Sequence, residues 1–350
     1  MAEIGSLSLE FTRLSQLTGD PKYYDSVRRV TNALEAQQNS TKIPGLWPIV
    51  VNAAALIFNH ERTFTLGGMA DSMYEYLPKE YLMLGGLEPQ YQTMYETAIE
   101  TAKRYLFFRP MTPENHDILL SGSARSDDDE NSQLDPLGQH LTCFVGGMVA
   151  IASKIFSRPD DLDIARKLVE GCIWAYNSTR TGIMPELFRV IPCADPKNCE
   201  WSQQEWYNAV NRIHQPKDEP PMSIDERAEM LIKFFHLPPG FTEINERKYI
   251  LRPEAIESLF IMYRITGEKR YQDIAWQMFL NIDRQCRTEI SYAAISDVSV
   301  DGGPKMDSSE SFWMAETLKY LYLVFSEPDL VSLDEWVFNT EAHPLRRPRA

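Results

Sequence analysis

One short sequence occurs twice in the chain, and each copy separates two amphipathic segments. Residues Thr18–Asp25 read TGDPKYYD, and residues Thr266–Asp273 read TGEKRYQD. In both copies a glycine follows one helical pattern and a second pattern begins soon after, as happens where one helix stops and the next starts. Looser versions stand at residues 85–92, 157–164 and 326–330. The sequence therefore predicts a series of helical hairpins, and their irregular spacing favours a closed ring over a regular solenoid.

The segments around these turns carry apolar residues at i, i+3, i+4 and i+7, which is typical of helices that pack on a core. Alternating patterns typical of strands are limited to short stretches near Ile183–Val190 and Ile290–Val300. Residues 125–135 are rich in acids but lack the glycine and the terminal glutamate of a calcium loop. We expect a solvated loop there.

Charge and hydropathy exclude two classes of partner. The 350 residues include 50 acidic and 35 basic side chains, and this balance does not supply the clustered cations that bind nucleic acids. Because 43% of the residues are apolar, the chain can bury a sizeable core. The longest apolar run, Trp47–Phe58, is too short to cross a bilayer, and no targeting segment is recognisable. We expect no membrane contact by this chain.

A polar residue lies near the start of each apolar segment that ends at one of the turns. These residues are Glu3, Asp71, His140, Glu254 and Glu316. If the segments are parallel inner helices of a barrel, the side chains gather at one mouth of it, where helix N-termini favour carboxylates by about 0.3–1 kcal/mol. Like charges repel, so such a cluster indicates a sugar or metal site. The alternative is that these are ordinary N-terminal acids that face solvent.

Two strings place acids on shared helix faces. In TLGGMADSMYEYLPKEYLMLGG, Asp71 and Glu75 are spaced i, i+4 among apolar neighbours. In LRPEAIESLF, Glu254 and Glu257 are spaced i, i+3, and Arg252 beside them can hold an anion or a sugar hydroxyl.

Two further strings suggest ligands. In ESFWMAETLKYLYLVF, Phe312 stands one turn before Glu316, and an aromatic face beside a carboxylate is a common way to seat a sugar ring. VFNTEAHPL contains Thr340 and Glu341, whose hard oxygen atoms suit calcium better than zinc.

These four strings, with HLTCFVGGM, GIMPE and the opening AEIGSLSLEFTRLSQLTGDPKYY, resemble glycoside hydrolase family 47, the class I α-1,2-mannosidases. The resemblance covers residues 1–350 as one catalytic domain. It implies an all-α fold, an (α/α)7 barrel of helical hairpins with short β hairpins at one end. It also implies inverting hydrolysis of terminal α-1,2-linked mannose from a high-mannose oligosaccharide or glycoprotein, with a calcium ion as cofactor. Two residues before Asp71 the chain has Met69, and an apolar residue at this position resembles the Golgi-type and secreted fungal members.

Position by position, the resemblance implies three groups of site residues. Asp71, Glu186 and Glu254 are identified as catalytic carboxylates, with Glu254 as the base that activates water. Thr340 is identified as the direct protein ligand of calcium. The sugar-binding shell comprises Glu3, Glu75, His140, Arg252, Glu257, Phe312 and Glu316.

The five cysteines fit no zinc pattern. The resemblance implies a disulfide between Cys143 and Cys172. Cys193 and Cys199 can close a local loop, and Cys286 is then a buried free thiol. Together with two N-x-S/T sequons, the cysteines favour the secretory pathway, either the lumen of the endoplasmic reticulum or Golgi or the outside of the cell.

The sequence departs from the family at its start. The family's barrel begins before the first helix of this chain, and the glutamate usually assigned as proton donor precedes that helix. We therefore expect a barrel that is incomplete at the N-terminus, without its N-terminal third, and a chain with weak or no activity. The alternative is a non-catalytic mannose-glycan-binding or quality-control protein on the same scaffold. A monomer is expected.

Overall fold

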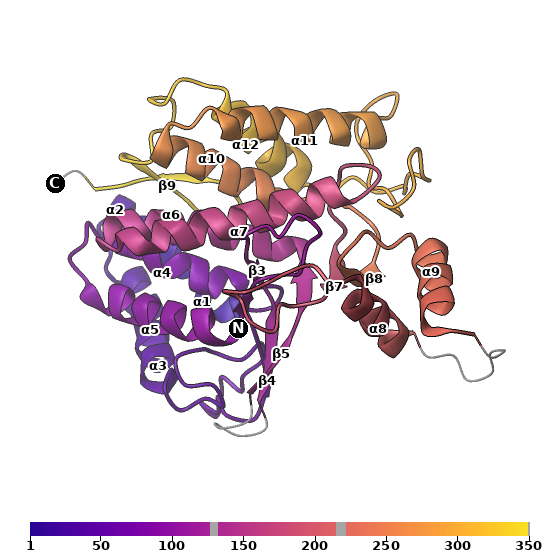
Figure 1. The fold of residues 1–350 in the computed structure, drawn as a ribbon. Coiled ribbons are helices and arrows are strands. Elements are labelled where there is room, and N and C mark those ends of the chain that lie inside the picture. The colour runs from indigo at the N-terminus through magenta and orange to yellow at the C-terminus, as the bar shows by residue number, and fades with distance from the viewer. Residues whose placement is uncertain (127–131, 215–221, 349–350) are drawn as a thin grey trace.

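The helices of successive hairpins form two layers in the structure, a computed structural model that describes residues 1–126, 132–214 and 222–348 (Figure 1). The inner row begins with α1 (Ala2–Gly5) and α2 (Ser8–Thr18), both of which contact α4 (Asp71–Met83). From α4 on, each helix of the row contacts the next: α6 (Phe144–Ile155), α10 (Glu254–Thr266) and α12 (Leu318–Val324). Four outer helices pack on the inner helices that precede them: α3 (Lys22–Gln37), α5 (Pro89–Tyr105), α7 (Pro159–Ser178) and α11 (Arg270–Cys286).

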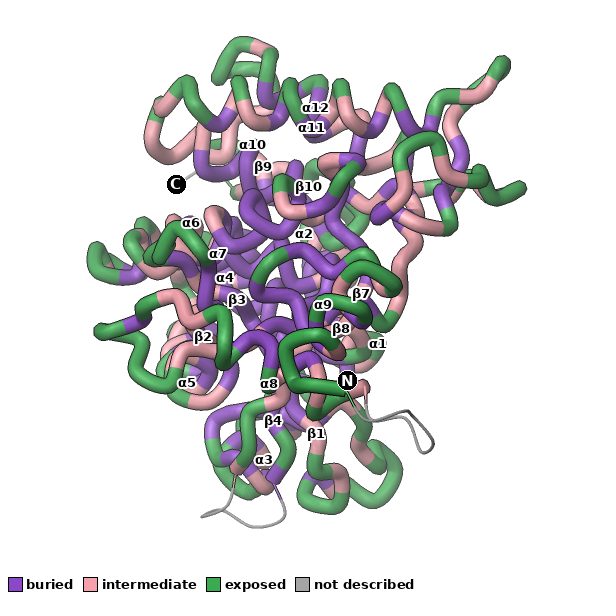
Figure 2. The backbone as a smooth tube through the Cα atoms, turned by 45° about the vertical axis from the view of Figure 1, so that its right-hand side comes forward, coloured by how far each residue is buried: buried purple, intermediate pink, exposed green. Residues whose placement is uncertain are grey.

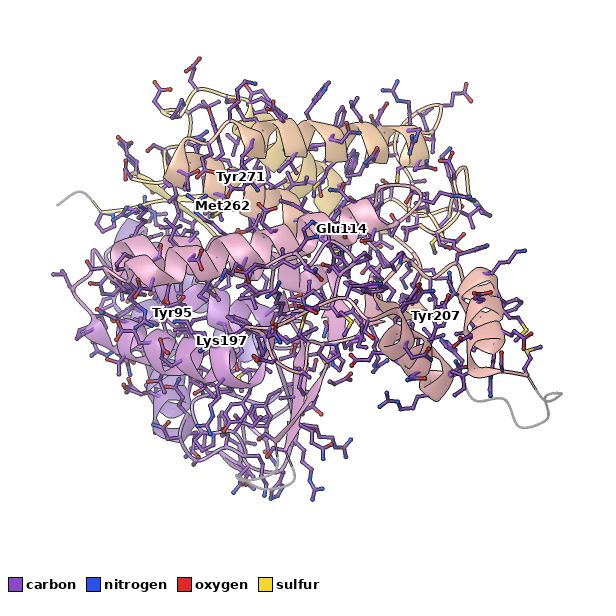
Figure 3. The ribbon with its side chains drawn as sticks, in the orientation of Figure 1. Tyr95, Glu114, Lys197, Tyr207, Met262 and Tyr271 are labelled. Carbon is purple, nitrogen blue, oxygen red and sulfur yellow. A yellow bond between two sulfur atoms is a disulfide. The ribbon has the colours of Figure 1, made fainter. Side chains whose placement is uncertain are left out.

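Burial distinguishes the two layers. Most residues of α4 and α10 are buried, whereas α3 buries only Val27, Thr31 and Leu34, one stripe at helical spacing. Figure 2 shows the buried backbone running through the centre of the molecule, with exposed stretches around it. The outer helices are anchored by large buried side chains such as Tyr95 on α5 and Tyr271 on α11 (Figure 3).

The repeated sequence forms the same turn in both copies, as predicted. Gly19 and Gly267 end α2 and α10 with φ values of 71° and 70°, a left-handed conformation that glycine adopts without a steric penalty. The hydroxyl of Thr18 accepts a hydrogen bond from the Asp20 N–H at 3.2 Å, and Thr266 accepts one from Glu268 at the same distance. These turns send the chain from the inner layer to the outer layer.

The first predicted helix is broken. The pattern indicated one helix up to Thr18, but α1 ends at Gly5 and α2 begins at Ser8. Both the N–H and the hydroxyl of Ser6 donate to the carbonyl oxygen of Ala2, at 3.0 and 2.7 Å. A serine side chain that binds the backbone in this way competes with helix continuation.

Two shorter helices pack on each other, α8 (Gln203–Ile213) and α9 (Ile224–Phe235), and α8 also contacts the strand β8 (Phe241–Glu246). Both begin with a serine cap: Ser202 accepts from the Glu205 N–H and Ser223 from the Glu226 N–H. Within the described ranges, no helix has the length and apolar character that a membrane crossing requires.

Among the described residues, four small antiparallel sheets complete the fold, with strand orders β1–β4–β5, β2–β3, β6–β7–β8 and β9–β10. The strands are β1 (Thr63–Thr65), β2 (Phe107–Phe108), β3 (Leu120–Ser121), β4 (Ser123–Ser126), β5 (Ser132–Asp135), β6 (Leu137–Gln139), β7 (Leu187–Val190), β8 (Phe241–Glu246), β9 (Trp336–Phe338) and β10 (Pro344–Arg346).

The strand predictions were right at one place and wrong at another. β7 lies in the stretch predicted near residues 183–190, but residues 290–300 form only isolated bridges. There Asp297 accepts from the N–H of Ser299 at 2.8 Å, a turn that interrupts a strand. The solvated loop expected at 125–135 was also partly wrong, because β4 and β5 pair across it; residues 127–131 lie outside the described residues.

The β9–β10 hairpin fills the space between the two ends of the inner row. Successive residues of a strand point to opposite sides. Val337 packs in a cluster with Leu9 of α2 and Met83 of α4. The ring of its neighbour Phe338 lies 5.8 Å from that of Phe260 on α10 and 5.7 Å from that of Tyr320 on α12. The hairpin therefore connects both sides of the barrel through side chains that lie next to each other in sequence.

Two disulfides cross-link the described chain. Cys143, at the end of the short helix η1 (His140–Cys143), is bonded to Cys172 of α7 with Cα atoms 6.0 Å apart, as the resemblance implies. Cys193 and Cys199 are bonded with Cα atoms 5.5 Å apart, and Cys286 is a buried free thiol.

The first disulfide closes the longer loop, with a sequence separation of 29 against 6. In the chain-entropy model, its loss costs about 3.6 kcal/mol and the loss of the shorter one about 2.3 kcal/mol. We expect Cys143→Ser/Cys172→Ser to lower the free energy of unfolding more than Cys193→Ser/Cys199→Ser, as measured by urea denaturation. A larger loss from the short loop would contradict this order.

Candidate active site

Asp71 and Glu254 are the first residues of α4 and α10. Backbone N–H groups are unpaired at a helix N-terminus, and the helix dipole favours negative charge there. Both helices contact α6, and the charge of Glu254 acts on Asp71. The structure therefore brings the two acids together at one end of the inner row, as the sequence analysis predicts.

The chain enters both helices through a residue in an unfavourable conformation. Met69 has a φ of 73° and Leu251 a φ of 70°, a region that residues other than glycine seldom adopt. The hydroxyl of Thr317 donates to the carbonyl oxygen of the buried Leu251 at 2.7 Å. Such strain costs about 1–3 kcal/mol and is often found at functional sites.

A buried histidine holds Glu254. His140, on the single turn η1 (His140–Cys143), has its Nδ1 3.0 Å from Glu254 Oε2 and its Nε2 2.7 Å from the hydroxyl of Tyr176. When Nδ1 carries the proton, the ring donates to Glu254 and accepts from Tyr176, so both nitrogen atoms are used. This arrangement fixes the direction of the Glu254 carboxylate.

Arg252 connects the acids with an aromatic ring. Its Nε donates to Glu186 Oε2, its Nη1 lies 3.5 Å from Glu254 Oε1, and its guanidinium carbon lies 5.8 Å from the centre of the Phe312 ring. The other carboxylate oxygen of Glu186, Oε1, is buried and finds no hydrogen-bond donor among the described residues. That oxygen is an acceptor which a hydroxyl group of a ligand can satisfy.

Lys79 lies between two of the predicted acids, and the sequence analysis missed it. Its Nζ binds Glu75 Oε1 and lies 3.5 Å from Glu257 Oε1, to which Tyr320 also donates at 3.3 Å. All four side chains are buried. Burial lowers the pKa of Lys79, but Glu75 and Glu257 raise it by more, so the ammonium stays charged. The i, i+4 spacing of Glu75 and Lys79 on a helix was the available signal.

The site holds more negative charge than its cations balance. Burial raises the pKa of Asp71 to about 6, and the charges of Glu75 and Glu254 act in the same direction. Burial raises the pKa of Glu316 to about 8, with further contributions from Glu254, Glu257, Glu341 and Glu75. The predicted acids of α4, α10 and the helical turn η2 (Trp313–Thr317) therefore share one electrostatic environment.

Thr340 lies at the tip of the β9–β10 hairpin, where three other side chains hold it. Its N–H donates to the hydroxyl of Tyr76 at 3.3 Å, and that hydroxyl donates to Glu10 at 2.7 Å. Asn339 also donates to Glu10, at 2.9 Å, and its own side-chain oxygen accepts from the N–H groups of Glu341 and His343. Sequence analysis missed Tyr76, Glu10 and Asn339, because their contacts join opposite ends of the chain.

Glu3, also predicted as a site residue, takes no part in the contacts described above. It is exposed on α1, and its charge, like that of Asp71, acts on the amino group of Met1. Among the residues that the structure describes, no group of three or more His, Cys, Asp or Glu side chains is arranged to hold a metal ion. A cation at this site would therefore rely on other oxygen ligands.

Breaking the buried ion pair tests this electrostatic account. Replacing Lys79 with Met leaves two buried carboxylates without their cation, and loss of one partner of a buried pair typically costs about 3–5 kcal/mol. A carboxyl whose pKa is higher in the folded than in the unfolded state loses stability as the pH rises through that interval. We therefore expect Lys79→Met to reduce the free energy of unfolding more at pH 8 than at pH 5, in urea titrations.

The matched control is the double variant Lys79→Met/Glu257→Gln, which removes one of the stranded charges and should recover part of the loss at pH 8. An equal loss at both pH values, with no recovery in the double variant, would contradict the charge argument.

Comparisons with known proteins bear on this site. An endoplasmic reticulum mannosyl-oligosaccharide 1,2-alpha-mannosidase of Mus musculus is 34% identical over 350 residues, which are 99% of this chain and 45% of that protein. A mannosyl-oligosaccharide alpha-1,2-mannosidase of Penicillium citrinum is 35% identical over 353 residues, 99% of this chain and 61% of the relative. The chain thus spans about half the length of the curated relatives it matches.

The fold has a solved counterpart. An alpha-1,2-mannosidase from Trichoderma reesei superposes with a TM-score of 0.77 and 30% identity, over 99% of this chain and 66% of that one. The predicted helical barrel is confirmed by this likeness. The sequence model of glycosyl hydrolase family 47 matches residues 1–347. The chain belongs to glycosyl hydrolase family 47.

Proposed function

We propose that the protein is a mannosyl-oligosaccharide 1,2-α-mannosidase that hydrolyses terminal α-1,2-linked mannose from high-mannose N-glycans. The observation that carries the proposal is the pair of acids at the starts of α4 and α10. Glu254 is held by His140 and Arg252, whereas burial raises the pKa of Asp71. Two carboxyl groups in different environments are what an acid and base pair requires. The family and the activity after which its relatives are named support the same function.

In this proposal Glu254 is the general base. His140 and Arg252 fix its two oxygen atoms, and Glu254 takes a proton from a water molecule as the water oxygen attacks the anomeric carbon. The bond from that carbon to the leaving oxygen breaks, and the leaving oxygen receives a proton, with inversion of configuration. With a pKa of about 6, Asp71 can hold that proton and deliver it directly or through a water molecule.

The remaining side chains are proposed to bind the sugar. Phe312 and Arg252 offer a flat face beside the acids, and the unpaired Oε1 of Glu186 can accept from a sugar hydroxyl. Glu75, Glu257 and Glu316 are further acceptors at the bottom of the site. Glu3 and Met69 are exposed, and we place them where the rest of an oligosaccharide would enter.

We also propose that the site uses calcium, with Thr340 as the direct protein ligand. The residues fit this ion: the hydroxyl and carbonyl oxygens of Thr340 are hard donors, and the neighbouring acids carry an excess of negative charge. A bound calcium ion would polarise sugar hydroxyls and orient the attacking water. Tyr76, Glu10 and Asn339 hold the Thr340 backbone in place for this role.

The cellular setting is part of the same proposal. Disulfides form in oxidising compartments, and the structure contains two. We propose that the protein works in the secretory pathway or outside the cell, on glycoprotein glycans, as a monomer. The hydrophobic core extends from Met1 to Ala342, which supports one continuous domain.

The activity is tested by replacing the base. With Asp71 supplying the proton, we expect the protein to release mannose from α-1,2-linked mannobiose, at the low rate that the sequence analysis predicts. Glu254→Gln should lower kcat by a further factor of about 10²–10⁴, the usual contribution of acid–base catalysis. Glu289→Gln, at an exposed residue, should leave kcat unchanged. Binding of the oligosaccharide without any release of mannose would support the glycan-binding alternative instead.

The calcium proposal is tested through Tyr76. Replacing it with Phe keeps the ring but removes the hydroxyl that links Thr340 to Glu10. Loss of such an outer contact typically weakens a metal site by about 10-fold or more. Calorimetric titration with Ca²⁺ should show this loss in Tyr76→Phe and none in Tyr322→Phe, at an exposed tyrosine. Equal affinity in both variants would show that the contact does not position the ligand.

A further inference from the structure

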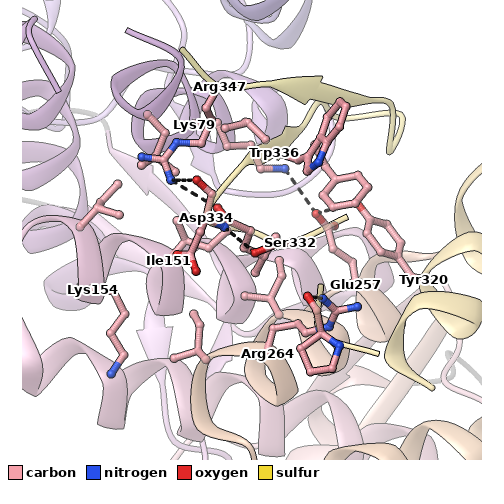
Figure 4. Close-up of a pocket in the computed structure, with 18 residues that line it drawn as sticks. Lys79, Ile151, Lys154, Glu257, Arg264, Tyr320, Ser332, Asp334, Trp336 and Arg347 are labelled. Atoms are coloured by element: carbon pink, nitrogen blue, oxygen red, sulfur yellow. Dashed lines mark hydrogen bonds and ion pairs between the residues drawn. The ribbon is translucent and has the colours of Figure 1, made fainter. Parts of the chain in front are cut away.

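A cavity lies beyond the acid cluster, toward the other end of the inner helices. It has a volume of about 400 Å³ and is lined by the C-terminal halves of α4, α6 and α10, by α12 and by residues 328–347. Figure 4 shows Lys79 and Glu257 on its wall, with Lys154 and Arg264 projecting from the helices around it. Lys79 and Glu257 are therefore shared: their ion pair separates this cavity, called here the far chamber, from the acid cluster.

The walls of the far chamber are largely apolar. Its lining includes Leu82, Ile151, Ile155, Ile261, Ile265 and Val337. Binding sites for small organic ligands are typically cavities of about 300–1,000 Å³ with apolar walls and a few placed polar groups. The far chamber meets both criteria. The acid cluster differs from it chemically, because its polar groups suit a sugar.

Positive charge surrounds the far chamber. Lys154, Arg264 and Arg347 line it together with the exposed carboxylate of Asp334, while the lining carboxylate of Glu257 pairs with Lys79. The guanidinium groups of Arg264 and Arg347 donate to backbone carbonyl oxygens, which carry no formal charge. The carboxylate of Asp329 also acts on the charge of Arg264. The Nε of Arg264 is buried and has no acceptor within the described residues. In a chain with a net charge of −15, this is a local reversal of sign.

We propose that the far chamber binds a small amphipathic anion, with its apolar body between the isoleucines of α6 and α10 and its carboxylate or phosphate head beside one of the lining cations, Lys154, Arg264 or Arg347. Burial of an apolar chain contributes about 0.8 kcal/mol per CH₂ group. The cations select the sign of the head group, because an ammonium would meet like charge. This site is distinct from the sugar site and does not depend on the proposed hydrolase activity.

Calorimetry with simple probes tests the proposal. Octanoate and octyl phosphate present the same chain with the two candidate heads, and octylamine presents it with the opposite charge. We expect saturable binding of one molecule of at least one anion per chain, and no saturable binding of octylamine. The anion that binds more tightly identifies the head group. Failure of both anions to bind, or equal binding of octylamine, would overturn the proposal.

Two variants locate the binding. Ile265→Phe places a larger side chain in the chamber and should abolish anion binding, with folding checked by circular dichroism. Lys154→Glu changes an exposed residue and should weaken binding about fivefold, since an exposed charge contributes up to about 1 kcal/mol. Lys233→Glu makes the same charge change on the exposed face of α9 and should have no effect. Unchanged binding in Lys154→Glu and in folded Ile265→Phe would place the anion elsewhere and refute the assignment.

Discussion

Negative charge buried at one end of the inner helices is the constraint on which the rest of the structure depends. Removing a carboxylate from water costs several kcal/mol unless partners compensate for it. The fold supplies compensation from three directions: helix N-termini at Asp71 and Glu254, the ammonium of Lys79 from below, and Arg252 with His140 from the side. These partners do not compensate fully for the burial of the carboxylates, and the pKa values of Asp71 and Glu316 are therefore raised. Since a site of this kind lowers stability, its retention is explained by chemistry rather than by folding.

The position of the β9–β10 hairpin is also related to this buried negative charge. It enters the row among apolar side chains and ends at Thr340, so it brings oxygen ligands, rather than more apolar surface, to the charged end. The bond from Asn339 to Glu10 joins residues 329 positions apart. The ends of the described chain therefore meet at the site, and the site is complete only when the two ends have folded against each other. Closing so long a loop is costly in entropy, and the packing of Val337 and Phe338 on opposite sides of the barrel offsets that cost.

Local patterns predicted the parts of the fold that local physics determines. Helical periodicity and the two TG turns gave the hairpins, and the placement of Asp71 and Glu254 at helix starts followed from the same spacing. Contacts between distant segments were not predictable in this way. The strand β4 pairs with β1, about 60 residues earlier, and β5 then pairs with β4. Lys79 was overlooked because one sequence shows its spacing from Glu75 but not its approach to Glu257, 178 residues away.

The geometry of α4 explains how one set of helices forms both the acid cluster and the apolar far chamber. Lys79 follows Asp71 by eight residues, which at 1.5 Å per residue places it about 12 Å along the axis. The acids occupy the first two turns, Lys79 and Glu257 form a layer beneath them, and Leu82 already faces the apolar cavity. A helix of 13 residues is thus long enough to contribute to the acid cluster and to the far chamber, provided that a single layer of side chains separates the two. The Lys79–Glu257 pair is suited to that position, because the two partners neutralise each other while both line the far chamber and Glu257 also acts on Glu316 in the acid cluster.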